Sequence, residues 1–361
     1  MKGIYSMIYF NNDYSEGCHP EILKALAQTN LEQSSGYGTD GHCAAAAAKI
    51  RAICQDDTLA VHFLVGGTQA NLTVIAAALR PHQGAIGADT AHINCHETGS
   101  IEATGHKVLA IPGKDGKITA RQIKDLVLAH RADESFEHTV QPKLVYLSTP
   151  TELGTLYTLD ELEAISSICR ELGLYLFVDG ARLGYGLAAK GNDVTLPDLA
   201  RLCDVFYIGG TKVGALFGEA VVISNSALKE DFRYLIKQRG GMLAKGRLLG
   251  LQFEILMEND LYTTIAAQAI ALADQIRDCL ASLHVPMLVE NTTNQIFPIL
   301  PNAVLEKLSE KYVFCEQCSV DDTHRAVRIC TSWATVKENV DALCQDLRQA
   351  MAAPIESVDE M

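Results

Sequence analysis

The chain has 361 residues, of which 48% are hydrophobic and 20% are charged, proportions that are typical of an ordinary globular protein. Its formal net charge of −14 disfavours nucleic acid and anionic membrane surfaces as partners, because both would repel it. No stretch is long and apolar enough to span a bilayer, and residues 1–7 lack the apolar run of a signal peptide, so we expect a cytoplasmic protein.

Short apolar stretches alternate with helical patterns through the first two thirds of the chain. Two helices are predicted first, at 20–29 and, in an alanine-rich segment, at 42–54. Seven buried strands are then predicted, with helical patterns between most of them: 59–65, 84–87, 107–111, 143–148, 174–178, 204–208 and 220–223. This order predicts an α/β fold with a mainly parallel sheet covered by helices on both faces.

The pattern changes after residue 226. A basic, glycine-containing segment at 237–247 leads into a long helical stretch that is broken near Asn259. The remainder reads as a small α/β unit with strands at 295–300 and 326–330 and helices on either side. We therefore predict a large domain over residues 1–255 and a small C-terminal domain over residues 256–361.

The eleven cysteines are scattered along the chain, mostly in apolar or helical stretches, which favours reduced thiols over a disulfide framework. Cys315 and Cys318 have the C-x-x-C spacing of a metal or redox site. No second pair of this kind and no histidine pair accompanies them, so we expect no metal site.

Two strand ends carry residues suited to chemistry. Lys212 follows the strand at 204–208 in a loop of small residues, where an ammonium group loses solvation and can become a Schiff-base nucleophile. Asp179 directly follows the strand at 174–178. Ligands of parallel sheets bind at the carboxyl ends of the strands, so both side chains are expected in one site. The structural alternatives are a solvated lysine and a helix-capping aspartate.

A third strand, at 59–65, leads into a glycine-threonine turn, Gly66 to Thr68, which opens a helix. Backbone N–H groups at such a helix start can hold a phosphate, and glycines permit its close approach. An ordinary turn with Thr68 as the helix N-cap is the alternative. Neither the dinucleotide-binding glycine fingerprint nor the P-loop signature is present, which disfavours Rossmann-type and ATP-binding folds.

Together these parts match the needs of pyridoxal phosphate. Gly67 and Thr68 would hold its phosphate, and Asp179 would keep its ring nitrogen protonated, so that the ring acts as an electron sink. Lys212 would bind its aldehyde, and His92, in an imidazole-rich segment after the strand at 84–87, would stack on its ring.

With these residues the chain resembles the threonine aldolase/β-eliminating lyase group of pyridoxal-phosphate enzymes, which have the aspartate-aminotransferase-type fold (fold type I). The resemblance covers nearly the whole chain, and Val-Asp-Gly-Ala-Arg followed by Thr-Lys-x-Gly is its most specific part. It implies retro-aldol cleavage of L-threonine or L-allo-threonine to glycine and an aldehyde. It also implies a homodimer or homotetramer with shared active sites, in which Tyr37 and the segment 237–247 are similar to parts that reach a neighbouring subunit.

The resemblance implies a role for each residue that matches its motifs. Lys212 is similar to the Schiff-base lysine, Asp179 to the partner of the ring nitrogen and His92 to the stacking histidine. Gly67, Thr68 and Arg182 are similar to other cofactor-binding residues. Substrate-carboxylate ligands are implied at Ser15, Arg182 and Arg328, although the motif around Ser15 is altered here.

The sequence leaves the base for the substrate hydroxyl open. Some relatives carry a histidine in the loop after the strand at 143–148, but residues 149–154 contain none. His92, Glu152 or a water could serve. A pyridoxal-phosphate lyase that eliminates at Cβ, and a non-catalytic protein with the same fold, are the rival functions.

Overall fold

A computed structural model describes residues 7–352 and contains a seven-stranded sheet in the order β2-β8-β7-β6-β5-β3-β4. The prediction about a signal peptide in residues 1–7 falls almost wholly outside the described residues. β8 runs opposite to the other six strands, which are parallel to one another, and this confirms the predicted mainly parallel sheet. The strands are β2 (Ala60–Leu64), β3 (Gln83–Ala88), β4 (Lys107–Ile111), β5 (Gln141–Ser148), β6 (Tyr175–Asp179), β7 (Val205–Gly209) and β8 (Glu219–Ile223).

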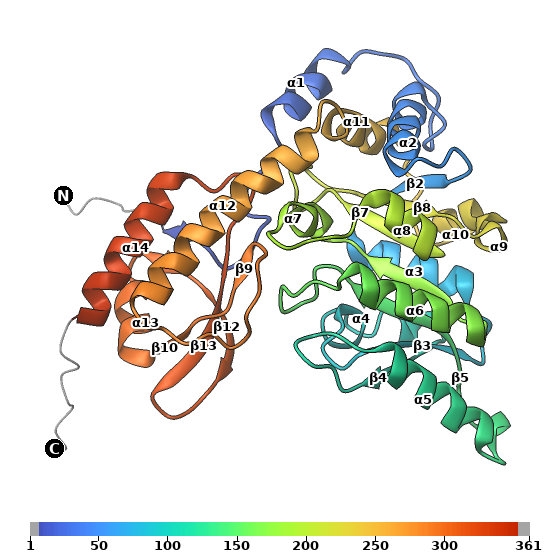
Figure 1. The fold of residues 1–361 in the computed structure, drawn as a ribbon. Helices are drawn as coiled ribbons and strands as arrows, with labels where there is room; N and C mark the ends of the chain where they lie inside the picture. The colour runs from blue at the N-terminus through green and yellow to red at the C-terminus, as the bar shows by residue number, and fades with distance from the viewer. Residues whose placement is uncertain (1–6, 353–361) are drawn as a thin grey trace.

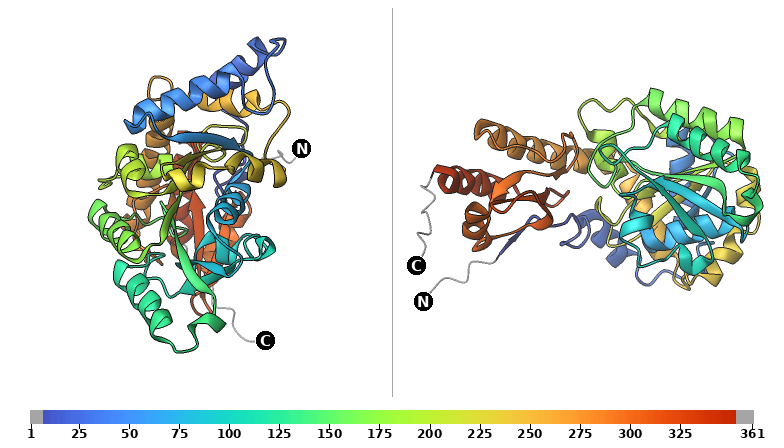
Figure 2. Two further views of the ribbon diagram at one scale, coloured as in Figure 1. Left: turned by 90° about the vertical axis from the view of Figure 1, so that its right-hand side faces the viewer. Right: turned by 90° about the horizontal axis from the view of Figure 1, so that it is seen from below.

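Helices cover both faces of this sheet (Figure 2, left). On one face lie α5 (Ala120–Ala132), α6 (Leu159–Leu172) and α8 (Leu196–Leu202), and on the other lies α3 (Gly67–Ala78). Helix α6 illustrates why these segments fold as they do. A Thr158–Glu161 capping box starts it, Leu162, Ile165 and Cys169 form its buried stripe, and Gly173 ends it in a left-handed conformation.

Other helices surround the sheet or connect its strands. α11 (Arg247–Leu256) contacts both α1 (Pro20–Gln28) and α2 (Gly41–Cys54) beyond the β2 edge (Figure 1). The predicted break near Asn259 is confirmed, since Asn259 and Asp260 both have positive φ between α11 and α12 (Leu261–Ser282). The remaining helices are short: α4 (His92–Cys95), α7 (Leu183–Ala188), α9 (Ser226–Lys229) and α10 (Phe232–Gln238).

A second apolar cluster lies beside the sheet domain, and α12 runs from one to the other (Figure 1). Its residues come from α13 (Asn302–Ser309), α14 (Lys337–Ala352) and the strands β9 (Gln295–Ile296), β10 (Ile299–Pro301) and β13 (His324–Cys330). Strand β12 (Cys315–Ser319) pairs with β13 at the margin of this cluster. The N-terminal segment joins it, because β1 (Ile8–Tyr9) pairs in parallel with β11 (Tyr312–Val313) and Phe10 is buried in the same cluster.

Two local predictions differ from the structure here. The strand predicted at 295–300 is split into β9 and β10, because Pro298 between them has no N–H to donate to a ladder. Strand β12 was not predicted, since its sequence is polar and largely exposed and lacks alternating apolar residues. Within residues 7–352, no helix has both the length and the apolar character required to cross a membrane.

Candidate active site

Several strands of the large sheet end at one edge and carry the predicted site residues there. Asp179 is the last residue of β6 and lies in register with Ser148 at the end of β5. Lys212 follows β7, and the turn of Gly67 and Thr68 follows β2. The fourth element, α4, begins at His92 after β3. The predicted convergence of these segments on the carboxyl edge of the sheet is therefore confirmed.

Asp179 is buried and accepts hydrogen bonds from three directions. Tyr146 Oη lies 2.5 Å and Asn71 Nδ2 lies 3.1 Å from its Oδ2, and the backbone N–H of Ala181 lies 2.9 Å from its Oδ1. These donors satisfy both carboxyl oxygens although the group is removed from water. Its negative charge also helps to raise the pKa of Tyr146 well above the ordinary range, with burial as the larger cause.

A second carboxylate, Glu97, positions His92. Oε1 of Glu97 lies 2.8 Å from His92 Nδ1, and the Glu97 side chain has no exposed surface. Asn71 Nδ2 lies 2.6 Å from the same oxygen, and Ser100 Oγ donates to the other at 2.6 Å. Because the carboxylate accepts at Nδ1, the Nε2 of His92 is the nitrogen left for a ligand.

Asn71 joins the two carboxylates into one network, since its single amide nitrogen lies within hydrogen-bond distance of both Glu97 and Asp179. The sequence reasoning missed Asn71, Tyr146 and Glu97. All three lie close to the proposed motifs in the sequence, and Glu97 ends the segment that was singled out for its histidines. The only signal was the unusual polarity of that segment between buried elements.

Lys212 is half-buried. Burial and, next, the charge of Arg182 hold the pKa of its ammonium below the usual range, which outweighs the opposing effect of Asp13 and Asp179. Its backbone is fixed by Tyr185, whose Oη donates to the Lys212 carbonyl at 2.6 Å. A lysine that loses its proton more easily is a better nucleophile toward a carbonyl carbon.

The chain before Lys212 packs tightly against the Asp-Gly-Ala-Arg motif. A Cβ at Gly180 would lie 1.9 Å from the carbonyl oxygen of Tyr207 in β7. Only glycine fits there, because the atom it would meet belongs to the backbone and cannot move aside. The glycine of this motif therefore fixes the distance between the loop of Asp179 and the loop of Lys212.

The glycine turn is not the ordinary turn with a Thr68 N-cap that the sequence left as an alternative. Gly66, and not Thr68, is the N-cap of α3, and no side chain caps the helix. The N–H groups of the first turn are therefore available to an anion. Gly67 lies over Tyr207, because an added Cβ would be 3.0 Å from its Oη, and this buried hydroxyl has no hydrogen-bond partner among the described residues.

The segment around β13 brings Arg328 to the site from the second apolar cluster. Its Nη2 donates to the Asn11 carbonyl at 3.1 Å, its contact with Gln295 is long at 3.5 Å, and its buried Nε has no partner among the described residues. Arg328 lies close enough to His96 to help lower its pKa, after the larger effect of burial. Arg328 thus has spare donors.

The other two predicted carboxylate ligands, Arg182 and Ser15, have different hydrogen-bond partners. Arg182 forms a bidentate ion pair with Asp13, with nitrogen–oxygen distances of 2.7 and 3.0 Å. Burial opposes the charges, but Arg182 and Lys212 still hold the pKa of Asp13 below its usual value. Asp13 is fully buried, whereas Ser15 is exposed and donates to Asn12. Of these two loop residues, Asp13 lies in the charged centre and Ser15 at its rim.

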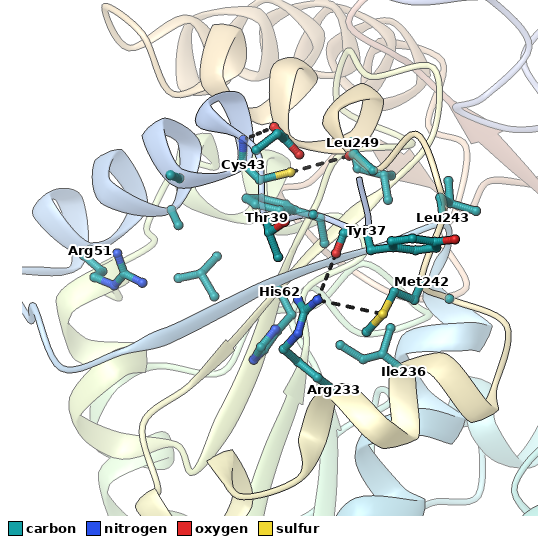
Figure 3. Close-up of a pocket in the computed structure, with 18 residues that line it drawn as sticks. Tyr37, Thr39, Cys43, Arg51, His62, Arg233, Ile236, Met242, Leu243 and Leu249 are labelled. Carbon is teal, nitrogen blue, oxygen red and sulfur yellow. Dashed lines mark hydrogen bonds between the residues drawn. The ribbon is translucent and has the colours of Figure 1, made fainter. Parts of the chain in front are cut away.

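A separate cavity of about 220 Å³ lies on the other side of the β2 edge, between α2, α10 and the segment before α11 (Figure 3). Tyr37, His62 and Arg233 line it, and none of the strand ends described above reaches it. Lys237 Nζ lies 4.7 Å from the centre of the Tyr37 ring. The segment 237–247 therefore contacts Tyr37 of its own chain.

Comparisons with known proteins identify the family of this chain. The family profile for beta-eliminating lyases matches residues 12–302, which is most of the chain. The chain belongs to the beta-eliminating lyase family. A low-specificity L-threonine aldolase of Pseudomonas aeruginosa is 32% identical over 351 residues, which cover 95% of this chain and 98% of that protein.

Solved structures of related proteins agree with this family assignment. A threonine aldolase of Leishmania major is 45% identical, with a TM-score of 0.93 over 96% of this chain and 100% of that one. An aspartate aminotransferase variant of Thermus thermophilus, 14% identical with a TM-score of 0.70 over 96% of this chain and 92% of that one, shows the fold alone. The resemblance and the fold type inferred from the sequence are thus confirmed, and a Rossmann-type enzyme is excluded.

The cofactor of the beta-eliminating lyase family is pyridoxal 5'-phosphate, as expected from the sequence. The residues of this chain fit it. The uncapped first turn of α3 suits a phosphate, the ionised Asp179 suits a protonated ring nitrogen, and the lowered pKa of Lys212 suits a carbonyl partner. The orphaned hydroxyl of Tyr207 below Gly67 is a further polar group that a ligand could satisfy.

Proposed function

We propose that this beta-eliminating lyase cleaves β-hydroxy-α-amino acids, with L-threonine and L-allo-threonine as substrates, to glycine and an aldehyde. The convergence of Lys212, Asp179 and the His92–Glu97 pair at one sheet edge is the observation that carries the proposal. The similarity to low-specificity L-threonine aldolases over 95% of the chain supports this substrate class over other amino acids.

Bound pyridoxal phosphate would supply an electron sink for the cleavage of the Cα–Cβ bond. We assign Lys212 as its covalent anchor and Gly67 and Thr68 as donors to its phosphate. Asp179 would keep a proton on the ring nitrogen through its charge, and His92 would lie against the ring face. The Lys212 Nζ would supply the amine that binds the cofactor carbonyl.

We propose His92 as the base that takes the proton from the substrate hydroxyl. Its Nε2 is free, and Glu97 stabilises the imidazolium that forms when Nε2 gains the proton. Glu152 is the other candidate. It accepts from the His92 backbone N–H at 2.8 Å and from Ser148 Oγ at 2.6 Å, and burial raises its pKa. Only its Oε1 is occupied, so the preference for His92 rests on the Glu97–His92 hydrogen bond, which supports an imidazolium.

The substrate carboxylate is proposed to bind at Arg328, Arg182 and Ser15. Arg328 supports this best, because its guanidinium has a buried nitrogen without a partner. Arg182 is proposed to bind the substrate while it stays paired with Asp13, since its Nε and one terminal nitrogen already donate to that carboxylate. Ser15 is proposed to contribute its hydroxyl from the exposed rim.

A substrate assay tests the proposed function. The purified protein, saturated with pyridoxal phosphate, is incubated separately with L-threonine, L-allo-threonine, L-serine and L-cysteine. We expect glycine and acetaldehyde from both threonine isomers, measured by coupled reduction of the aldehyde and by chromatography of the amino acids. A keto acid from serine or cysteine, with no glycine from threonine, would instead identify an eliminating lyase.

Replacement of Arg328 by lysine is expected to raise KM for L-threonine about tenfold and to change kcat less than about threefold. Lysine keeps the charge but lacks the planar fork that binds a carboxylate with two hydrogen bonds. Steady-state kinetics separates the two constants. Arg325→Lys on the same strand is the matched control, because Arg325 is exposed and pairs only with Glu316. An unchanged KM in Arg328→Lys would rule out this carboxylate site.

The proposal includes an assembly of two or four copies with shared active sites, in the cytoplasm. Exposed apolar side chains at Leu23, Leu31 and Tyr37 near the N-terminus support a contact with another copy. Eleven free cysteines support a reducing compartment.

We also keep the division into a large domain, 1–255, and a small domain, 256–361, as a proposal.

A further inference from the structure

Glu219 is a buried carboxyl group that the proposed mechanism does not use. It is the first residue of β8, and its side chain is only 3% exposed. Both of its oxygens are occupied: Thr211 Oγ lies 3.0 Å from Oε1, and the backbone N–H of Gly210 lies 3.1 Å from Oε2. Buried carboxyl groups with specific hydrogen bonds are often functional, so we ask what Glu219 does at this sheet edge.

The register of the sheet places Glu219 between two parts of the proposed cofactor site. Glu219 pairs with Leu64 of β2 on one side and with Gly209 of β7 on the other. β2 continues into the uncapped turn at Gly67, and β7 continues into Thr211 and Lys212. Its carboxyl group points toward this edge, since both of its partners lie beyond the end of β7.

The charged and titratable groups that face Glu219 come from several elements. Lys212 favours its ionised form, and Asp179 at the end of β6 opposes it. Burial raises the pKa of the phenols of Tyr207 on β7 and Tyr262 on α12, and the negative charge of Glu219 adds to this rise. β2 places the apolar Leu64 opposite it in the sheet, and Phe253 of α11 packs against its neighbours Gly210 and Gly218. Burial outweighs the favourable groups and raises the pKa of Glu219 to about 8.

Thr211 has one hydroxyl hydrogen, and its use depends on the charge of Glu219. Thr211 Oγ accepts from the backbone N–H of Gly218 at 3.0 Å. When Glu219 is ionised, the Thr211 hydrogen must point to the carboxylate, which can only accept. When Glu219 is protonated, it can donate to the remaining lone pair of Thr211 Oγ, and the threonine hydrogen becomes free.

An anionic phosphate at the turn changes this balance. A phosphate and an ionised carboxylate in one buried site repel each other, because the low dielectric screens them poorly. We propose that Glu219, under conditions where it is ionised in the free protein, takes up a proton from solvent when the phosphate group binds at the Gly67–Thr68 turn, and that the protonated acid donates to Thr211 so that the Thr211 hydroxyl can bind the phosphate. Only a proton moves in this step: it leaves a solvent or buffer molecule and forms an O–H bond on the Glu219 carboxyl.

Glu219 is thus a positioning residue that acts through Thr211 and links phosphate binding to proton uptake. The inference rests on the proposed function, since it requires that the phosphate of pyridoxal phosphate binds at this turn. Glu219→Gln is the decisive variant. The glutamine amide donates permanently to Thr211 and still offers its oxygen to Gly210, so it imitates the protonated acid.

The first test is the affinity for pyridoxal 5'-phosphate between about pH 7 and pH 10, measured by absorbance or fluorescence titration of the wild type and Glu219→Gln. We expect the ratio of wild-type Kd to variant Kd to rise about tenfold per pH unit above pH 8, because one linked proton is lost. With pyridoxal, which has no phosphate, the ratio should not depend on pH. In a Thr211→Val background, Glu219→Gln should have a smaller effect, because the hydrogen bond through Thr211 is lost and only the charge repulsion between carboxylate and phosphate remains.

A second measurement needs no variant. Inorganic phosphate is already a dianion above about pH 8 and therefore brings no titrating proton of its own. Isothermal titration of the wild type with inorganic phosphate, in two buffers of different ionisation enthalpy, should reveal an uptake approaching one proton per site. An absence of uptake would overturn the inference even if Glu219→Gln fails to fold.

The outcomes separate the inference from the proposed function. If the wild type binds pyridoxal phosphate but the Kd ratio is flat with pH, the role of Glu219 is wrong and the proposed function stands. The same conclusion follows if Glu219→Gln binds the cofactor far more weakly than the wild type at about pH 7, where the acid is protonated in both free and bound protein. If the wild type binds no pyridoxal phosphate, the role of Glu219 and the proposed function are both wrong.

Discussion

Replacement of Lys212 by arginine is expected to lower kcat/KM for L-threonine cleavage by roughly three orders of magnitude or more, since the guanidinium cannot replace an amine nucleophile. Arginine keeps the positive charge beside Asp13 and Asp179, so the ionic environment of the site is preserved. The rate is measured as aldehyde release at saturating cofactor.

The control for this variant is Lys190→Arg, since Lys190 is exposed on the surface. It should retain wild-type activity. Far-ultraviolet circular dichroism and thermal unfolding should show that Lys212→Arg is folded. Threonine cleavage by Lys212→Arg within tenfold of the wild type would show that another group anchors the cofactor.

Replacement of Asp179 by asparagine has the second largest expected effect, a decrease of kcat by roughly a thousandfold. Asparagine keeps the size of the side chain but lacks the charge that holds a proton on the ring nitrogen of the cofactor. It also brings an NH₂ group toward Tyr146 and Asn71, which both donate to the native carboxylate. Steady-state assays with L-threonine measure kcat, and cofactor absorbance reports the protonation of the ring.

Asp125→Asn provides the control for charge removal, because Asp125 lies on the exposed face of α5 and only pairs with Arg121. We expect it to be indistinguishable from the wild type. A kcat for Asp179→Asn close to that of Asp125→Asn would mean that the ring nitrogen does not rely on this carboxylate.

The sequence predicts the sheet because its strands are buried and apolar and alternate with amphipathic helices. For the same reason it predicts which loops meet, since successive parallel strands end at the same edge. Lys212 and Asp179 could be located from the sequence because each lies at or shortly after the end of such a strand. Short elements such as α7 and α8 were not predicted, because six or seven residues contain too few turns to show a helical period.

The partners of these residues could not be predicted, because they depend on side-chain packing between distant segments. Asp13 and Arg182 are 169 residues apart, and nothing local in either segment indicates the pair. Glu219 lies just before the strand predicted at 220–223, and only the register of β8 brings it to Thr211. The site is therefore more strongly charged than its motifs suggest.

The central claim is that Lys212 carries the cofactor, and one measurement tests it directly. The protein is loaded with pyridoxal phosphate, reduced with borohydride, digested and analysed by mass spectrometry. We predict that the phosphopyridoxyl group is found on Nζ of Lys212 at close to one per chain. A protein that binds no cofactor, or a label found on a different lysine, would contradict the account.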